Sequence, residues 1–406
     1  MIKKLAIAVL LAGWVIHLAV ASAASKDIIL GMSADFTGPN KGLGAEFYLG
    51  ADCYFRMVNQ NGGIHGRKIV IKAYDDGYDP EPAVNNTIRL IEDGDVFALF
   101  NYVGTPTTTR ILPLLKHYHD RTIWLFTPLT GAQPVLDNEY IFSLRASYSD
   151  EISKMVDELV KRGFKKVAVL HQLDAYGRGG WQSISTSLKR HGLEIAGEAT
   201  YERGSSFNTS FNDQVSILKK ASPDAIISVA AYEPAAAFIR DARNAGLEVP
   251  ILNLSFVNAK RMHELLTSLE SGSSEKYTSN LINTQVVPFY GFEDFDPVQK
   301  FSSCMDTFKP GLPEGIDTTA YTFKEPGAVG FEGFLNAWFL SEILEQMGPD
   351  IERKIIREVL DQPIKSYPQI LAAHGYPEMI DTGNVYFISF ANNQITSVND
   401  LSGLIK

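Results

Sequence analysis

From residue 26 onward, short apolar segments typical of strands alternate with longer segments that have the spacing of amphipathic helices. Strand candidates lie at 26–31, 68–74, 96–100, 122–126, 140–145, 166–170, 193–199, 225–229, 251–254 and 284–287. The helix candidates between them lie at 44–61, from 80, 111–119, 151–162, 180–191, 211–220, 234–245 and 259–269. A chain that alternates in this way is expected to form mostly parallel sheets with helices on both faces.

The alternation completes one unit by about residue 147 and starts again near Asp150. The later residues contain helix candidates at 297–308, 327–347 and 351–361 and a strand pair at 385–389 and 394–398. This segment is too rich in helix for a third sheet domain. We therefore expect an α/β fold with two doubly wound lobes, in which the chain crosses between the lobes several times.

The N-terminus has the features of a secretory signal peptide. Lys3 and Lys4 precede an apolar run at 5–21, and Ala21-Ser22-Ala23 fits a small-residue cleavage site. No cysteine is placed to carry a lipid, so we expect residues 1–23 to be removed and the mature protein to be free in the periplasm. An uncleaved anchor is the alternative, but His17 interrupts a run shorter than the ~20 residues that a membrane span needs.

The charge balance excludes one class of partner. The chain has 37 Lys and Arg against 47 Asp and Glu, and without Lys3 and Lys4 the counts are 35 against 47, a formal charge of −12. Such an acidic surface argues against nucleic-acid binding and favours a soluble carrier.

The two cysteines, Cys53 and Cys304, are too few for a disulfide framework. Each falls in an expected amphipathic helix. We expect two buried thiols rather than a bridge, although the sequence leaves both open.

Residues 100–110 form a turn suited to an anion. The buried strand ends at Gly104, and the following helix begins with several hydroxyl residues. Free backbone N–H groups and the helix dipole at such a turn attract carboxylates. The alternative is that Thr105, Thr107 and Thr108 only cap the helix.

Other polar groups are expected at the same cleft, because ligands of open α/β sheets sit beyond the carboxyl ends of the strands. In the first lobe these are the backbone groups around Leu129, Thr130 and Gly131. In the second lobe three tyrosines follow strand candidates, namely Tyr148, Tyr176 and Tyr232. Tyrosine combines an apolar face with a hydrogen-bonding tip, which suits a partly apolar ligand, although half-buried packing is the alternative for each.

Three rival motifs do not meet their requirements. The glycines at 177–180 lack the third glycine of a dinucleotide fingerprint, because Gln182 stands in its place. The aspartates at 75–79 lack the twelfth-position Glu of a calcium loop, and the side chains of His117 and His119 diverge on a helix. No G-x-S-x-G occurs. We therefore expect no cofactor, no metal and no catalytic residue.

Four segments carry a resemblance to a known family. They are Phe-Thr-Gly-Pro at 36–39, Asn-Gly-Gly-Ile-His-Gly-Arg-Lys at 61–68, the Asp-Asp and Asp-Pro pairs at 75–80, and Gln172 with Asp-Ala-Tyr-Gly at 174–177. Together they resemble the periplasmic solute-binding proteins of branched-chain amino-acid ABC transporters, which have the type I periplasmic binding fold. The resemblance implies three crossing segments, with lobe one at 24–147 plus 285–380 and lobe two at 148–284 plus 381–406. It also implies that the lobes close on a ligand like a Venus flytrap.

The resemblance also implies roles for single residues. A hydroxyl residue that holds the α-carboxylate in the leucine/isoleucine/valine binders matches Thr105, aided by the turn at 129–131, and their lobe-two tyrosines match Tyr176 and Tyr232. Where they place a Glu for the α-ammonium, this chain has Ser255, and Leu43 replaces a first-loop tyrosine. A buried ammonium without a carboxylate is costly. Small carboxylates, aromatic ones included, or amides are therefore alternatives to an amino acid.

The expected function is that of a periplasmic, monomeric receptor that delivers a small organic solute to an inner-membrane ABC permease with its ATPase. The first alternative is a ligand-sensing module for a membrane signalling protein. The second is a secreted hydrolase.

Overall fold

The computed structural model describes residues 26–93, 96–270, 276–288, 295–317, 319, 321–322, 325, 327–360, 366–376, 385–391, 394–398 and 401. The predicted signal peptide lies outside these residues. No helix within the described ranges is both long and apolar enough to cross a membrane.

A five-stranded parallel sheet organises the first lobe. Its order is β2 (Ile69–Asp75), β1 (Ile28–Ala34), β3 (Val96–Phe100), β4 (Leu125–Phe126) and β5 (Ile141–Phe142). All five residues of β3 are buried, which fits an unbroken apolar run in the middle of a covered sheet.

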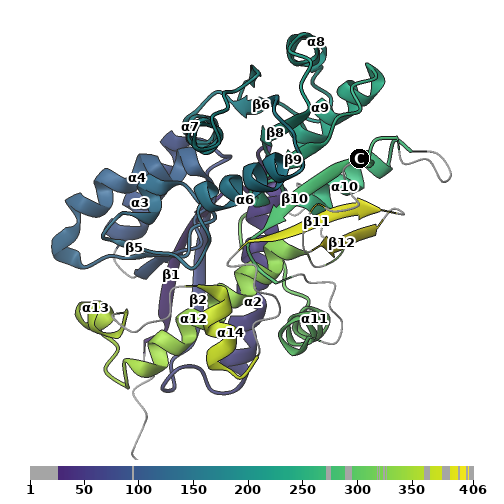
Figure 1. Cartoon of the computed structure of the whole chain (residues 1–406). Helices are drawn as coiled ribbons and strands as arrows, with labels where there is room; N and C mark the ends of the chain where they lie inside the picture. Colours follow the sequence, from purple (N-terminus) through teal and green to yellow (C-terminus); the bar gives the residue numbers. More distant parts are fainter. Residues whose placement is uncertain are drawn as a thin grey trace, which may run out of the picture.

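Helices cover both faces of this sheet. They are α2 (Lys41–Gln60), α3 (Pro80–Glu92), α4 (Thr105–His117) and the short α5 (Gln133–Leu136), joined later in the chain by α11 (Asp296–Phe308), α12 (Ala328–Gln346), α13 (Ile356–Leu360) and α14 (Tyr367–Ala373). In Figure 1, α3 and α4 lie on one side of β1 and β2, and α2 and α12 on the other. Right-handed crossovers produce this arrangement because the strand order reverses between β1 and β3.

The second lobe contains a seven-stranded sheet. Its order is β12 (Gln394–Val398), β11 (Tyr386–Ala391), β10 (Leu281–Gln285), β9 (Ile251–Asn253), β8 (Ala225–Val229), β6 (Val167–Gln172) and β7 (Gly197–Tyr201). Only β11 pairs antiparallel, with β10 and with β12. Its helices are α6 (Tyr148–Lys161), α7 (Ala175–Arg190), α8 (Asn212–Lys220), α9 (Tyr232–Asn244) and α10 (Ala259–Thr267).

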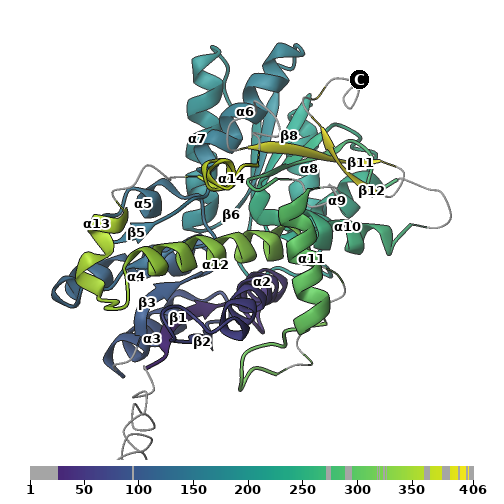
Figure 2. The ribbon, with the colours of Figure 1, turned by 90° about the horizontal axis from the view of Figure 1, so that it is seen from below.

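The chain passes from one sheet unit to the other between β5 and α6, between β10 and α11, and between α14 and β11. Figure 2 shows α12 lying beside α2, far from the second lobe's outer helices. Two α/β lobes were predicted from the sequence, and this fold class is confirmed. The boundary residues themselves stay a prediction, and the boundary at 380 falls outside the described residues.

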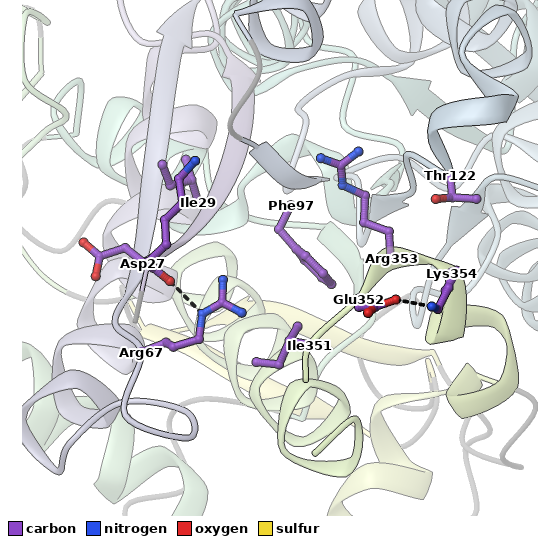
Figure 3. A pocket seen from close by; sticks show the side chains of 10 residues that line it. Asp27, Ile29, Arg67, Phe97, Thr122, Ile351, Glu352, Arg353 and Lys354 are labelled. Atoms are coloured by element: carbon purple, nitrogen blue, oxygen red, sulfur yellow. Dashed lines mark hydrogen bonds and ion pairs between the residues drawn. The ribbon is translucent and has the colours of Figure 1, made fainter. Parts of the chain in front are cut away.

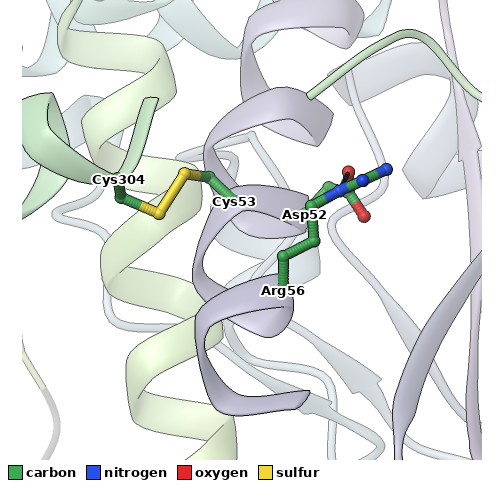
Figure 4. The surroundings of a disulfide bond; sticks show 4 residues. All are labelled: Asp52, Cys53, Arg56 and Cys304. Carbon is green, nitrogen blue, oxygen red and sulfur yellow. Dashed lines mark hydrogen bonds and ion pairs between the residues drawn. A yellow bond between two sulfur atoms is a disulfide. The ribbon is translucent and has the colours of Figure 1, made fainter. Parts of the chain in front are cut away.

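The expectation of two free thiols is wrong. Cys53 on α2 and Cys304 on α11 form a disulfide, with their Cα atoms 6.0 Å apart (Figure 4). The two helices pack against each other in the first lobe, which brings together cysteines that are 251 residues apart in the sequence. Helix periodicity places each cysteine on a buried face but does not reveal which helix it faces.

The helix after Gly104 carries the hydroxyl residues in its first turn, as expected for the turn at 100–110. It starts at Thr105, whereas the helix candidate in the strand and helix alternation was placed at 111–119. Pro106 stands at its second position, where a proline is tolerated because no intrahelical N–H bond is lost there. The helix α14 and the short α5 were not predicted.

Candidate functional site

Three helix N-termini meet at one cavity of about 550 Å³ between the lobes. Thr105 begins α4 in the first lobe, Tyr148 begins α6, and Tyr176 is the second residue of α7. The cavity is lined by residues 105 and 109 of α4, residues 131–134, residues 148–149 of α6, and residues 175–176, 178–179, 182–183 and 186 of α7. The cavity thus takes its walls from both lobes.

The first turn of α4 depends on Gly104. This glycine has a φ of 101°, and a Cβ atom there would lie 2.4 Å from a ring carbon of Tyr78. The Thr105 hydroxyl lies 2.7 Å from that of Thr130. Thr107 instead donates its hydroxyl to the carbonyl of Val103 at 2.6 Å, so its role is local and structural. Of the hydroxyls in this first turn, Thr105 lines the cavity and Thr107 does not.

The turn at 129–131 connects the starts of α4 and α6 through backbone hydrogen bonds. Leu129 donates its N–H to the Tyr102 carbonyl at 2.7 Å and accepts from Gly104 at 3.2 Å, which ties the turn to the start of α4. The Gly131 carbonyl accepts the N–H of Tyr148 at 2.8 Å. A Cβ atom on Gly131 would lie 2.7 Å from that nitrogen, so a larger residue would displace Tyr148. Gly131 lines the cavity, whereas Leu129 and Thr130 lie behind it.

The hydroxyls of Tyr148 and Tyr176 have no hydrogen-bond partner among the described residues, although the side chains are only 3% and 1% exposed. Their ring centroids are 5.3 Å apart. Burial raises the pKa of Tyr148, an effect opposed first by the charge of Arg145 and then by the nearby hydroxyls of Thr130 and Thr105. Buried tyrosine hydroxyls usually find a partner, which makes these two candidates for a hydrogen bond to a ligand.

Two predicted site residues lie elsewhere. The Tyr232 hydroxyl accepts the N–H of Gly42 at 3.4 Å and therefore joins α9 to α2 across the lobes. Ser255 donates both its N–H and its hydroxyl to Glu151, each at 2.8 Å, and accepts from Arg145. Neither side chain lines the cavity.

Ser255 belongs to a buried network at the crossing segments. Arg145 donates to both carboxylate oxygens of Glu332 on α12 at 2.7 Å, and Glu151 also accepts from Thr284. Burial acts to lower the pKa of Arg145, but the charges of Glu332 and Glu151, the nearby Tyr148 and the hydrogen bond to Glu332 together raise it. Burial raises the pKa of Glu151 against the opposing effect of Arg145. The guanidinium of Arg145 thus pairs with Glu332 and lies 4.0 Å from Glu151, so each carboxylate has a cation nearby.

A second charged contact joins the lobes directly. Glu46 on α2 accepts from Arg261 Nε on α10 at 2.5 Å and from the Tyr321 hydroxyl at 2.6 Å. The side chains of Glu46 and Arg261 are 0% and 6% exposed. Burial acts to lower the pKa of Arg261, but Glu46, together with Tyr321 and Glu264, raises it. Lys260 and Glu325 form a more exposed pair nearby, at 2.9 Å.

The rival motifs have structural roles. Gly177 packs so closely on β6 that a Cβ atom would lie 1.7 Å from the Gln172 carbonyl oxygen. Asp75 accepts the N–H of Phe36 at 2.8 Å, and Asp79 caps α3. Within the part of the chain that the structure describes, no three His, Cys, Asp or Glu side chains are grouped to hold a metal.

A second cavity of about 380 Å³ lies at the amino ends of β1 and β3, far from the strand ends that form the first one. Figure 3 shows Arg67, Arg353 and Lys354 among its lining residues. Arg67 donates to the Lys26 carbonyl at 2.6 Å, and Lys354 pairs with Glu352. It is lined by one lobe only, so lobe movement would not enclose a ligand there.

The sequence did not point to the α7 wall of the cavity. Arg178, Gln182 and Thr186 follow one another at four-residue intervals on α7, and all three line the cavity. This spacing marks one face of a helix, but an exposed polar face has the same spacing. A cavity-lining face of α7 can be told from a solvent-exposed polar face only because the structure places α4 opposite α7.

The comparisons with known proteins agree with this architecture. A family model described as periplasmic binding protein matches residues 27–375. The Leu/Ile/Val-binding protein homolog 3 of Brucella melitensis is 28% identical over 236 residues, which are 57% of this chain and 62% of the relative. The Leu/Ile/Val-binding protein of Citrobacter freundii is 26% identical over 233 residues, 56% of this chain and 61% of the relative. The chain therefore matches less than two thirds of the length of either relative.

Solved structures match over a longer range. A possible leucine/isoleucine/valine-binding protein from Rhodopirellula baltica superposes with a TM-score of 0.79 at 24% identity, covering 96% of this chain and 100% of that one. A substrate-binding periplasmic protein from Ralstonia solanacearum gives 0.77 at 25% identity, covering 92% and 100%. These likenesses extend the two-lobed fold to nearly the whole chain. The chain belongs to the periplasmic binding protein family.

Proposed function

We propose that this protein is the periplasmic substrate-binding component of an ABC importer. It captures a small amino-acid-like, carboxylate or amide solute between its lobes and delivers it to an inner-membrane permease with its ATPase. It is secreted through a cleaved signal peptide, acts as a monomer and performs no catalysis. The names of its relatives support this role, since they are Leu/Ile/Val-binding proteins.

The observation that carries the proposal is the cavity between α4 and α7. Its walls come from both lobes, and the buried hydroxyls of Tyr148 and Tyr176 have no partner among the described residues. A volume of about 550 Å³ falls within the range of small-molecule sites. Thr105 and the first turn of α4 provide donors for a polar or negative head group.

The ligand of the relatives cannot simply be assigned to this protein. A transporter substrate-binding protein from Streptococcus pneumoniae has been solved in complex with isoleucine, but it is only 17% identical to this chain. Ser255 stands where the resemblance leads us to expect an acid, and it is bonded to Glu151 and Arg145 rather than open to the cavity. We therefore place carboxylates and amides beside amino acids as solutes to test.

A thermal-shift screen of amino acids, aromatic acids, keto acids and amides tests the proposal. A solute present at 100 times its dissociation constant should add roughly 2.7 kcal/mol to the free energy of unfolding. Thr105→Ala should then weaken binding of the best solute while the protein still folds, with a modest loss of stability because the buried bond to Thr130 is also removed. Thr200→Ala, on the exposed edge strand β7, is the matched control and should bind normally. The proposal fails if no solute shifts the melting temperature, or if both variants bind equally well.

A further inference from the structure

The cavity between α4 and α7 has an unbalanced charge. Among its lining residues Arg178 is the one charged side chain, and no carboxylate is present. Arg178 is exposed, and its guanidinium makes no ion pair or hydrogen bond to a described residue. A group that carries a positive charge would therefore meet no opposite charge here.

The helix N-termini at the cavity add further positive potential. The helices α4, α6 and α7 all begin at the cavity, and the positive end of each helix dipole lies at its N-terminus. The helix α4 has no capping side chain and no acid in its first turn.

The acids at the other two helix starts are already engaged. Asp174 accepts from the backbone of Tyr176 and Gly177, and Asp150 forms a capping box with Ser147. Glu151 is bound by Ser255. None of these carboxylates is available to an ammonium group.

The buried hydroxyls identify what does fit. Tyr148 and Tyr176 line the same cavity as Thr105, and their hydroxyls have no partner among the described residues. A carboxylate oxygen accepts from such donors. Ala132 and Pro134 supply apolar surface next to them for the rest of the ligand.

We propose that the ligand is a carboxylic acid anion without an ammonium group, and that Arg178 determines this preference by attracting the negative charge. The inference rests on the proposed function, since it names the solute class of the same cavity. The hydroxyls bind the carboxylate directly, and Arg178 acts from the rim of the site.

Matched solutes test the preference. Isothermal titration calorimetry would compare 4-methyl-2-oxopentanoate with leucine and leucinamide, and phenylpyruvate with phenylalanine and phenylalanine amide. Within at least one series the keto acid should bind at least about tenfold more tightly than the amino acid or the amide. Arg178→Gln should weaken binding of the keto acid by about threefold to tenfold. The effect should be larger at low salt, because ions screen an exposed charge. Lys189→Gln, at the exposed end of the same helix, should leave binding unchanged.

The outcomes separate this inference from the proposed function. Tighter binding of an amino acid or an amide than of its keto acid overturns the inference but leaves a solute receptor. Equal binding by Arg178→Gln and Lys189→Gln also overturns the role of Arg178. If neither keto acid binds, the inference fails, and the proposed function fails with it only when the wider thermal-shift screen is also empty.

Discussion

The cavity between α4 and α7 differs in chemistry from the contacts that join the lobes. The cavity is lined by hydroxyls and apolar groups, with Arg178 as its one charge. The contacts at the crossing segments and between α2 and α10 are built from carboxylates and guanidinium groups, such as Arg145 with Glu332 and Arg261 with Glu46. Tyr148 and Tyr176 at the cavity are as deeply buried as these charged groups, so burial alone does not distinguish a binding group from a structural one.

The difference lies in which polar atoms are already bonded. Glu332 and Glu151 each have two or more partners within the protein, whereas the hydroxyls of Tyr148 and Tyr176 have none among the described residues. A buried charge must be paired to be tolerated, which makes it suitable for fixing the lobes. Burying a neutral hydroxyl without a partner costs less free energy than burying an unpaired charge. Such a hydroxyl can therefore remain unbonded until a ligand binds.

The largest expected effect comes from breaking the ion pair at the crossing segments. Arg145→Met leaves the carboxylate of Glu332 buried without its cation, and the free energy of unfolding should fall by about 3–5 kcal/mol. Chemical denaturation measures this loss. The double variant with Glu332→Gln removes the uncompensated charge and should recover part of the stability. An unchanged unfolding free energy for Arg145→Met would contradict a structural role for this pair.

Asp35 tests a buried carboxylate that lacks such a cation. It accepts the N–H groups of Gly38 at 2.6 Å and Asn40 at 2.7 Å, and burial raises its pKa to about 7. The folded protein thus holds a proton that the unfolded chain releases near pH 4. The stabilising contribution is complete below that pH and is lost as the pH rises through 7.

Between pH 4 and pH 7 the free energy of unfolding should therefore fall, by up to about 4 kcal/mol for a shift of this size. Asp35→Asn should flatten this decline, whatever constant cost the altered hydrogen bonds add. Urea unfolding at several pH values gives the slope for both proteins. Equal slopes would show that Asp35 does not hold the proton.

Direct contacts between the lobes should have a smaller effect, and mainly on affinity. Glu46→Gln weakens the bonds from Arg261 and Tyr321, and charge-assisted bonds of this kind contribute about 1.5–3 kcal/mol each. A less populated closed form lowers the apparent affinity, here by about tenfold, for any solute found in the screen. Small-angle X-ray scattering of the ligand-free variant should show a larger radius of gyration.

Glu325→Gln is the matched control for this contact. Glu325 pairs with Lys260 across the same contact but is 75% exposed, so its loss should change affinity little. If Glu46→Gln binds as the parent does and scatters identically, the buried contact does not govern closure.

Local features of the sequence were sufficient for most of the elements. The run at Val96–Phe100 matches β3 residue for residue, and Asp79 before Pro80 marks the start of α3. Both signals act within a few residues, through burial in one case and capping in the other. The same local signals indicated that Tyr148 and Tyr176 follow strands, and the structure places both at the cavity.

Pairings across the fold were not accessible in this way. Arg145 and Glu332 are 187 residues apart, and Glu46 and Arg261 are 215 apart. Each is an ordinary polar residue of its helix or loop until the lobes pack together. The disulfide between Cys53 and Cys304 and the position of Ser255 away from the cavity depend on the same packing.

The smallest change, the loss of a single hydroxyl, separates the two regions most directly. Tyr148→Phe removes a group with no partner among the described residues, so the free energy of unfolding should stay within about 0.5 kcal/mol of the parent value. Binding of a solute found in the screen should weaken by about twofold to tenfold, because one hydrogen bond is worth about 0.5–1.5 kcal/mol.

Tyr102→Phe is the opposite case, since the Tyr102 hydroxyl lies 3.0 Å from that of Thr87 and is fully buried. That variant should lose stability and bind normally. If Tyr148→Phe lost stability and bound normally instead, its hydroxyl would belong with the structural contacts and not with the ligand.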